Sequence, residues 1–195
     1  SSLEYHMRRR KQQVVLVTSV GENEGKSTVA VNIALALAQK YDRVLLLESD
    51  LRKPACHTIM NQKDIKVSLK EVLLSNAKPE DALIQDRASG LYMMLAPKGI
   101  RNPGDLLGSK PMADLIQWCR DNFDFVVMDL PPMSVASDSE SILEFADGSM
   151  LVIRQNIVRA DALNRAIVAL KRGKAKFTGC VLNNVYSSFL SSGQG

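Results

Sequence analysis

The chain has 195 residues, of which 46% are hydrophobic, 24% are charged and 5% are aromatic. Its 25 Lys and Arg residues exceed its 21 Asp and Glu residues and give a net charge of +4. This composition predicts one soluble globular domain and excludes a disordered chain. The longest apolar runs have the length of a strand and fall far short of the ~20 residues that span a bilayer. The three cysteines are too scattered for a disulfide framework or a zinc site, which favours a reducing cytosol.

The first segment, residues 1–12, contains a basic run at Arg8–Lys11. One interpretation is a solvated lead-in to the first strand. The other is a segment that lies against anionic phospholipid, where each basic residue is worth about 1 kcal/mol. Nucleic acid is a weaker interpretation than either, because no basic stretch is interleaved with the aromatic rings on which single strands stack. We therefore expect no nucleic-acid partner.

Residues 13–186 alternate between apolar runs of strand length and helical patterns, and we expect them to form one domain. The predicted strands are residues 13–19, 43–48, 91–95, 123–130, 149–154 and 177–182. The predicted helices are residues 26–40, 69–74, 103–122, 138–145 and 161–172, with a short helical turn from Pro79. Several strands are apolar on both faces, as in parallel sheets that helices cover. The pattern predicts an α/β fold with a doubly wound, mostly parallel sheet.

A glycine-containing loop follows the first predicted strand and precedes the first predicted helix. Its Gly25-Lys26-Ser27 is the core of a phosphate-binding loop, in which backbone N–H groups at the helix N-terminus point at phosphate. Lys26 would reach the β- and γ-phosphates, and the Ser27 hydroxyl would bind Mg²⁺. The full pattern begins with a glycine where Val20 stands, with Gly21 one residue later. The strand–loop–helix setting nevertheless favours a P-loop NTPase fold over a turn with a surface lysine.

The whole loop is expected to surround the phosphates of a nucleotide. Its nucleotide-binding residues are expected to be Gly21, Glu22, Asn23, Glu24, Gly25, Lys26, Ser27 and Thr28. Two of these residues, Glu22 and Glu24, carry carboxylates that repel phosphate. We therefore expect both carboxylates to point outward, and their charge to weaken the affinity for the nucleotide.

Acidic residues end two of the predicted strands. The strand at residues 43–48 finishes in Glu48 and is followed by Ser49 and Asp50, and the strand at residues 123–130 ends around Asp129. In an open parallel sheet, ligands bind at the carboxyl ends of the strands. Mg²⁺ prefers the oxygen ligands that carboxylates offer. Two acidic strand ends after a phosphate loop therefore predict a site for a nucleotide with Mg²⁺.

These three stretches are similar to the Walker A, Walker A′ and Walker B motifs of the bacterial tyrosine autokinases of capsule and exopolysaccharide synthesis. The second motif of that family is Asp-x-Asp-x-Arg after a hydrophobic strand, which Glu48–Arg52 resembles. The third is Asp-x-Pro-Pro, which Asp129–Pro132 matches. Arg101–Leu107 resembles the family's Pro-x-Asn-Pro-x-Glu-Leu-Leu stretch. The related MinD/ParA-type ATPases carry a signature lysine where Gly21 stands, which favours the kinase branch.

The resemblance implies an ATP-dependent protein-tyrosine autokinase that regulates polysaccharide synthesis and export, with ATP/ADP and Mg²⁺ as cofactors. The implied catalytic residues are Lys26, Glu48, Asp50 and Asp129. The implied Mg²⁺ ligands are Ser27, Asp50 and Asp129. Of the pair Glu48 and Asp50, one helps to hold the metal and the other accepts the tyrosyl proton. Arg52 would stabilise charge or contact a neighbouring subunit, and Asn183 would lie near the adenine ring.

The resemblance also implies partners and a location. The partners are a transmembrane polysaccharide co-polymerase that acts as activator, fused or separate, and further copies of the chain in a ring. The substrates are tyrosine-containing proteins, including the chain's own tail. The implied location is the cytoplasm at the inner face of the cell membrane. Residues 187–195 are rich in Ser and Gly, and we expect a flexible tail whose tyrosine cluster has been truncated.

Glu48 stands where the family has Asp, and this departure leaves alternatives open. Glu is one methylene longer than Asp, and a misplacement of ~1 Å can cost about 10²-fold in rate. The chain could therefore be a weak kinase. The alternatives to a kinase are a MinD/ParA-like ATPase switch and a nucleotide-binding regulatory module that has lost turnover.

The remaining candidates are interpreted as structural. His57, which follows Cys56, has no partner at a spacing typical of metal binding or nucleophilic catalysis, so we expect an ordinary loop residue. Cys119 and Cys180 fall in apolar patterns, and we expect both to be buried as small hydrophobic residues.

Overall fold

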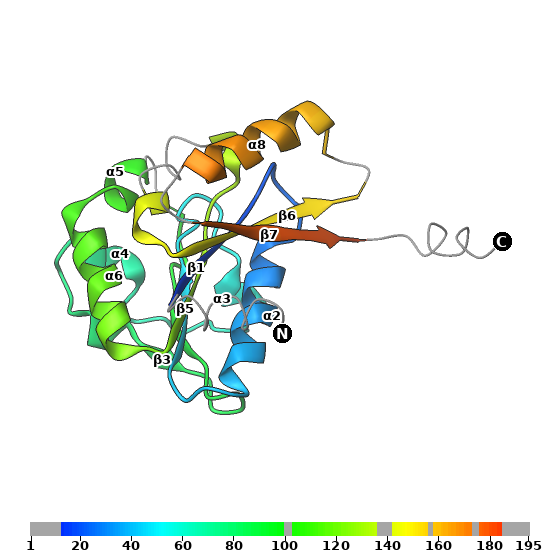
Figure 1. The fold of residues 1–195 in the computed structure, drawn as a ribbon. Coiled ribbons are helices and arrows are strands. Elements are labelled where there is room, and N and C mark those ends of the chain that lie inside the picture. Colours follow the sequence, from blue (N-terminus) through cyan, green and yellow to red (C-terminus); the bar gives the residue numbers. More distant parts are fainter. Residues whose placement is uncertain (1–12, 100–102, 136–141, 156–157, 173–175, 185–195) are drawn as a thin grey trace.

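The computed structural model describes residues 13–99, 103–135, 142–155, 158–172 and 176–184 (Figure 1). The expectations for the lead-in at residues 1–12, for the helix over residues 138–141 and for the tail at residues 187–195 lie outside these ranges. Within the described ranges, no helix combines the length and the apolarity that a membrane span requires.

The strands are β1 (Val14–Ser19), β2 (Val44–Glu48), β3 (Ile84–Gln85), β4 (Tyr92–Met94), β5 (Phe125–Asp129), β6 (Gly148–Arg154) and β7 (Lys176–Asn183). They form a seven-stranded sheet in the order β3-β4-β2-β5-β1-β6-β7. Neighbouring strands run parallel except β3, which is antiparallel to β4. The predicted α/β fold with a mostly parallel sheet is confirmed.

The helices are α2 (Lys26–Ala38), α3 (Cys56–Ile59), α4 (Leu69–Leu73), α5 (Gly104–Leu107), α6 (Lys110–Asn122) and α8 (Ala160–Arg172). Short 3₁₀ turns cover Pro79–Ala82, Met133–Val135 and Ile142–Phe145. Local sequence fixes where two of the helices begin. Ser68 and Glu71 form the capping box that starts α4, and the Ser109 hydroxyl accepts a hydrogen bond from Met112 N at the start of α6.

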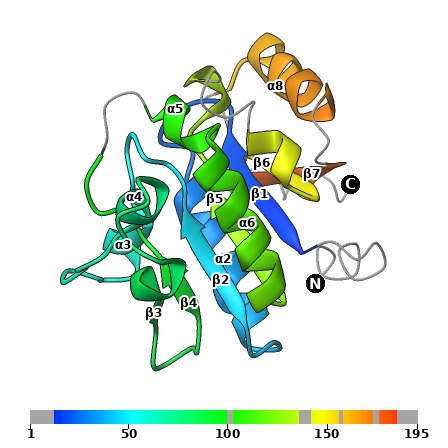
Figure 2. The same ribbon diagram turned by 90° about the vertical axis from the view of Figure 1, so that its left-hand side faces the viewer.

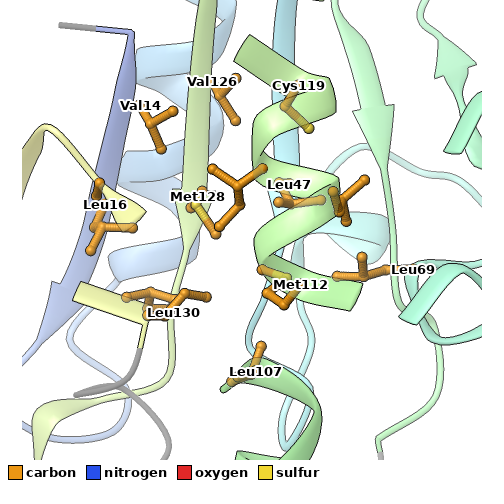
Figure 3. Close-up of a cluster of buried hydrophobic side chains, with 14 of the residues drawn as sticks. Val14, Leu16, Leu47, Leu69, Leu107, Met112, Cys119, Val126, Met128 and Leu130 are labelled. Carbon is orange, nitrogen blue, oxygen red and sulfur yellow. The ribbon is translucent and has the colours of Figure 1, made fainter. Parts of the chain in front are cut away.

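Helices cover both faces of the sheet. Alternate residues of a strand point to opposite faces, so each central strand contributes side chains to both layers. Val14 and Leu16 of β1 pack on one side with residues of α4, α6 and α8. Figure 3 shows both side chains in this cluster with residues of α4 and α6. Val15 and Val17 pack on the other side with residues of α2 and with the first residue of α3. Figure 2 shows α2 and α6 on opposite sides of the sheet. The central strands are therefore held from both faces, which fixes the positions of their carboxyl ends.

Several features differ from the prediction. The predicted helix over residues 103–122 is divided into α5 and α6, and the short helix α3 was not predicted. The edge strand β3 was not predicted, because a strand of two residues is too short to give a hydrophobic pattern. The described part of the predicted helix over residues 138–145 is the 3₁₀ turn at Ile142–Phe145. Cys180 is exposed, so the expectation that it is buried is wrong. It lies on the edge strand β7, where none of residues 177–183 is fully buried, whereas Cys119 on α6 is buried as predicted.

Candidate active site

The predicted phosphate loop lies at the carboxyl end of β1, in the interior of the sheet, and leads into α2. β5 pairs with β1 and β2 pairs with β5, so that Val17 and Glu48 both lie in register with Asp129. The parallel sheet therefore brings the loop and both acidic strand ends to one edge. This is the edge at which open α/β sheets bind their ligands.

Gly25 holds the backbone conformation with which α2 begins. Its φ of 85° and ψ of 18° are left-handed, a conformation that favours glycine. A side chain at Gly25 would also collide with the amide nitrogen of Asn183. Asn183 Nδ2 donates a hydrogen bond to the carbonyl oxygen of Glu24 at 2.9 Å, so Asn183 supports the loop from the end of β7. Its place near an adenine ring stays a prediction.

Glu24 is buried, so the expectation that its carboxylate points outward is wrong. The residue is 2% exposed, and its carboxylate accepts hydrogen bonds from Gly21 N and, at 3.3 Å, from Arg154 N. Burial raises the pKa of Glu24, and the backbone N–H groups of Gly21 and Arg154 oppose the rise. The carboxylate thus braces the loop against β6. Glu22 is exposed as expected, and it pairs with Lys53 at 2.6 Å.

Four predicted site residues meet in one buried cluster. Lys26 Nζ lies 2.6 Å from Asp50 Oδ2 and 3.2 Å from Asp129 Oδ1. Ser27 Oγ donates a hydrogen bond to Asp129 Oδ2 at 2.6 Å. Burial raises the pKa of Asp129, and the neighbouring Lys26 ammonium opposes the rise. Burial alone would lower the pKa of Lys26, but the Asp129 and Asp50 carboxylates outweigh it and raise that pKa, so Lys26 is a cation at neutral pH.

The oxygen atoms of this cluster fit a Mg²⁺ ion that arrives with a nucleotide. Asp50, Asp129 and Ser27 offer carboxylate and hydroxyl oxygens, which are the ligands that Mg²⁺ prefers. Among the residues that the structure describes, no three His, Cys, Asp or Glu side chains are grouped so as to hold a metal ion. Mg²⁺ that is held by one or two carboxylates takes its other ligands from phosphate and water. The donor set is therefore suited to a phosphate-bound ion and not to an ion held by the protein alone.

Glu48 is also buried at its strand end, but its carboxylate has other partners. The residue is 0% exposed. Its Oε2 accepts a hydrogen bond from Ala96 N at 2.7 Å. Its Oε1 accepts one from His57 N at 3.2 Å and lies 3.2 Å from His57 Nδ1. These partners set Glu48 apart from Asp50 and Asp129, which both pair with Lys26.

Two residues that the sequence interpretation treated as ordinary belong to the surroundings of the site. Cys56 and His57 are the first residues of α3 and do not lie in a loop. Cys56 is fully buried, and its Sγ donates to Asp129 Oδ2 at 3.4 Å. Burial and the Asp129 and Glu48 carboxylates raise the pKa of the Cys56 thiol, which keeps it protonated. The signal that could have found both residues is their position directly after the Walker A′-like stretch.

A cavity of about 620 Å³ opens beside the cluster. Its polar wall consists of residues 22–28 of the loop together with Asp50, Arg52 and Lys53. Its apolar wall consists of Ala55, Ile59, Pro132 and Val135. Arg52 thus lines the cavity, whereas Asn183 supports the loop from outside it. The cavity joins a charged end, at which three basic side chains and the N-terminus of α2 meet three acidic side chains, to an apolar lip, which is an arrangement that can hold a phosphate next to a ring.

Known proteins are similar to this chain in sequence and in fold. A family model described as an AAA domain matches residues 14–176. The tyrosine-protein kinase YwqD of Bacillus subtilis (strain 168) is 33% identical over 183 residues, which cover 94% of this chain and 77% of YwqD. The chain belongs to the bacterial tyrosine-protein kinase family. The crystal structure of the VpsO kinase domain matches this kinase with a TM-score of 0.87 at 30% identity, over 95% of this chain and 91% of that one.

The predicted relationship to MinD-type ATPases is confirmed at the level of the fold. MinD of Pyrococcus horikoshii OT3, solved with Mg-ADP, matches with a TM-score of 0.71 at 22% identity, over 87% of this kinase and 69% of MinD. The tyrosine-protein kinase wzc of Salmonella typhimurium is 26% identical over 188 residues, which cover 95% of this kinase and 26% of wzc. The family therefore includes kinases of about this length and much longer ones.

Proposed function

We propose that this kinase transfers the γ-phosphoryl group of ATP to tyrosine hydroxyls, including those of its own tail, and thereby regulates capsular or exopolysaccharide synthesis and export. The observation that carries the proposal is the buried cluster of Lys26, Asp50, Asp129 and Ser27 behind a phosphate-type loop. Family membership supplies the choice of tyrosine as acceptor.

The charges in the cluster suit phosphoryl transfer, in which positioning and neutralisation of charge supply most of the catalysis. Lys26 would turn from Asp50 to the β- and γ-phosphates. Ser27 and Asp129 would hold Mg²⁺ directly and Asp50 only through water, and the ion when bound neutralises phosphate charge and orients the γ-phosphoryl group.

The departure of Lys26 would free the Asp50 carboxylate, which lines the cavity. We therefore place the acceptor of the tyrosyl proton at Asp50. Both carboxylate oxygens of Glu48 accept hydrogen bonds, from His57 N and from Ala96 N. Arg52, which lines the same cavity, would stabilise negative charge on the transferred group.

We extend the proposal to partners and location. The chain would act at the inner face of the cell membrane with a transmembrane polysaccharide co-polymerase as activator, and it would assemble into a ring. The lengths of its relatives support an activator that is fused in some proteins and separate in others, because the chain covers 77% of YwqD but only 26% of wzc.

The test incubates the chain with Mg-ATP and a tyrosine-containing peptide and probes for phosphotyrosine beside Lys26→Met. We expect phosphotyrosine with the wild type and none with the variant. Phosphotyrosine that persists in Lys26→Met would overturn the assigned site. Phosphate release without phosphotyrosine would support a MinD/ParA-like ATPase switch, and nucleotide binding without turnover would support a regulatory module.

A further inference from the structure

The first turn of α3 contacts the two acidic strand ends at the same time. Cys56 Sγ donates to Asp129 Oδ2 at 3.4 Å, and His57 contacts Glu48 Oε1 through both its backbone N and its Nδ1 at 3.2 Å. Asp129 and Glu48 are the last residues of neighbouring strands and lie in register. Two consecutive residues of one helix therefore reach two carboxylates that stand side by side.

The other partners of Asp129 are those that a nucleotide would engage. Lys26 holds Asp129 Oδ1, and Ser27 holds Asp129 Oδ2. In the proposed function Lys26 turns to phosphate and Ser27 binds the metal ion. Cys56 is fully buried and has no role in nucleotide binding in the proposed function, so its contact with Asp129 can persist when the nucleotide binds.

Glu48 has a similar arrangement on the neighbouring strand. Its carboxylate is held by His57 on one oxygen and by Ala96 N on the other. His57, with a side chain that is 18% exposed, does not line the cavity. Both contacts of Glu48 therefore lie behind the surface that binds the ligand, as the Cys56 contact does.

We propose that Cys56 and His57 are positioning residues: Cys56 holds Asp129 in the orientation that the Mg-nucleotide site requires, and His57 holds Glu48, the neighbouring strand end. The proposal rests on the proposed function for the identity of the ligand. The thiol suits this role because it is a weak donor that orients a carboxylate without neutralising it. A soft thiol also does not compete with carboxylate for a hard ion such as Mg²⁺. Groups that orient metal ligands in this way commonly change metal affinity or activity about 10- to 100-fold when they are lost.

Cys56 is tested with a pair of variants that differ in one hydroxyl. Cys56→Ala removes the donor and Cys56→Ser keeps it, and Cys119→Ala is the matched control because Cys119 is equally buried but packs in the core on the other side of the sheet. The measurement is the Mg²⁺ concentration at half-maximal binding of ADP that carries a fluorescent methylanthraniloyl group, with the affinity for the same nucleotide in EDTA beside it.

We expect Cys56→Ala to raise the half-maximal Mg²⁺ concentration about tenfold, with the affinity in EDTA unchanged and with Cys56→Ser and Cys119→Ala close to the wild type. An equal shift in the Ser and Ala variants, or a shift of less than about twofold in the Ala variant, would overturn the role of Cys56. If Cys56→Ala does not fold, Cys56→Thr and Cys56→Val give the same comparison, since they too differ mainly in a hydroxyl.

His57 is tested through the Ala96 N–H, which donates a hydrogen bond to the other oxygen of the Glu48 carboxylate. In His57→Leu the Glu48 carboxylate loses the side-chain partner, and we expect faster hydrogen exchange of the Ala96 N–H. In His57→Asn the side-chain amide can take the place of Nδ1, and we expect the protection to return. Unchanged protection of Ala96 in His57→Leu would overturn the role of His57. Neither readout depends on phosphotyrosine, so a failure of the kinase proposal is distinguishable from a failure of this one.

Discussion

The variant that tests the nucleotide-free site most directly is Lys26→Met. The Lys26 side chain is 10% exposed, and its Nζ lies 2.6 Å from Asp50 Oδ2 and 3.2 Å from Asp129 Oδ1. Methionine keeps the length of the side chain and removes the charge. Two buried carboxylates are then left without their cation, which for buried pairs costs about 3–5 kcal/mol of the free energy of unfolding.

The pH dependence of this loss has a definite sign. Burial raises the pKa of Asp129, and Lys26 opposes the rise, so removal of Lys26 raises the folded-state pKa further. An acid whose pKa is raised on folding stabilises the fold fully below its unfolded pKa and loses that contribution as the pH rises through the folded pKa. The deficit of Lys26→Met is therefore expected to be largest at neutral pH and to shrink in acid.

The assay is unfolding by urea without nucleotide, at neutral pH and at a series of lower pH values. Lys53→Met is the matched control, because Lys53 Nζ lies at the same distance of 2.6 Å from Glu22 but its side chain is 69% exposed. Exposed pairs contribute about 0–1 kcal/mol, so this control is expected to unfold almost as the wild type does. Equal losses in the two variants, or a deficit of Lys26→Met that grows in acid, would refute the reasoning.

Three further variants test other contacts. Gly25→Ala forces a side chain onto a left-handed backbone and is expected to cost about 1–3 kcal/mol in urea unfolding and to abolish nucleotide binding; unaltered binding would contradict the loop geometry. The hydrogen bonds from Arg120 lower the pKa of Asp147, against the effect of burial. Arg120→Ala is therefore expected to lose about 2 kcal/mol of the free energy of unfolding near neutral pH. This deficit disappears as the pH falls through the folded pKa of Asp147. Glu48→Asp shortens the carboxylate that His57 holds and is expected to lower phosphotransfer by about tenfold, whereas faster transfer would favour Glu48 as the base.

The fold was predictable because its elements are long and regular enough to leave a pattern. β1 and β5 are apolar on both faces, and both are buried throughout. The capping box at Ser68 marks the start of α4 in the sequence itself. β3 could not be found in this way, because Ile84–Gln85 joins the sheet only through its pairing with β4, which the sequence does not display.

The site was predictable as far as its linear motifs reach. Lys26 and Asp129 could be placed together because a parallel sheet aligns its strand ends. The burial of Glu24 could not be predicted, because its carboxylate is satisfied by the backbone N–H of Arg154, 130 residues away in the sequence. The contact between Cys56 and Asp129, 73 residues apart, depends on the packing of α3 in the same way.

The charge balance of the cluster couples the binding of nucleotide and Mg²⁺. In the absence of nucleotide and Mg²⁺, Lys26 partly neutralises the Asp50 and Asp129 carboxylates. Free Mg²⁺ therefore meets the Lys26 cation next to the oxygen atoms that would bind it. A nucleotide without Mg²⁺ brings phosphate charge next to the same carboxylates. Each ligand removes the obstacle to the other, because phosphate draws Lys26 away and Mg²⁺ takes its place.

Thermodynamic linkage then requires that ADP and Mg²⁺ raise each other's affinity by the same factor. Titrations of Mg²⁺ with and without ADP, and of ADP with and without Mg²⁺, are expected to give equal factors of about 5- to 150-fold. In Lys26→Met the cation that opposes free Mg²⁺ is gone, so the affinity for Mg²⁺ without ADP is expected to rise and the coupling factor to fall. A coupling factor that is the same in the variant and the wild type would show that Lys26 does not link the two ligands.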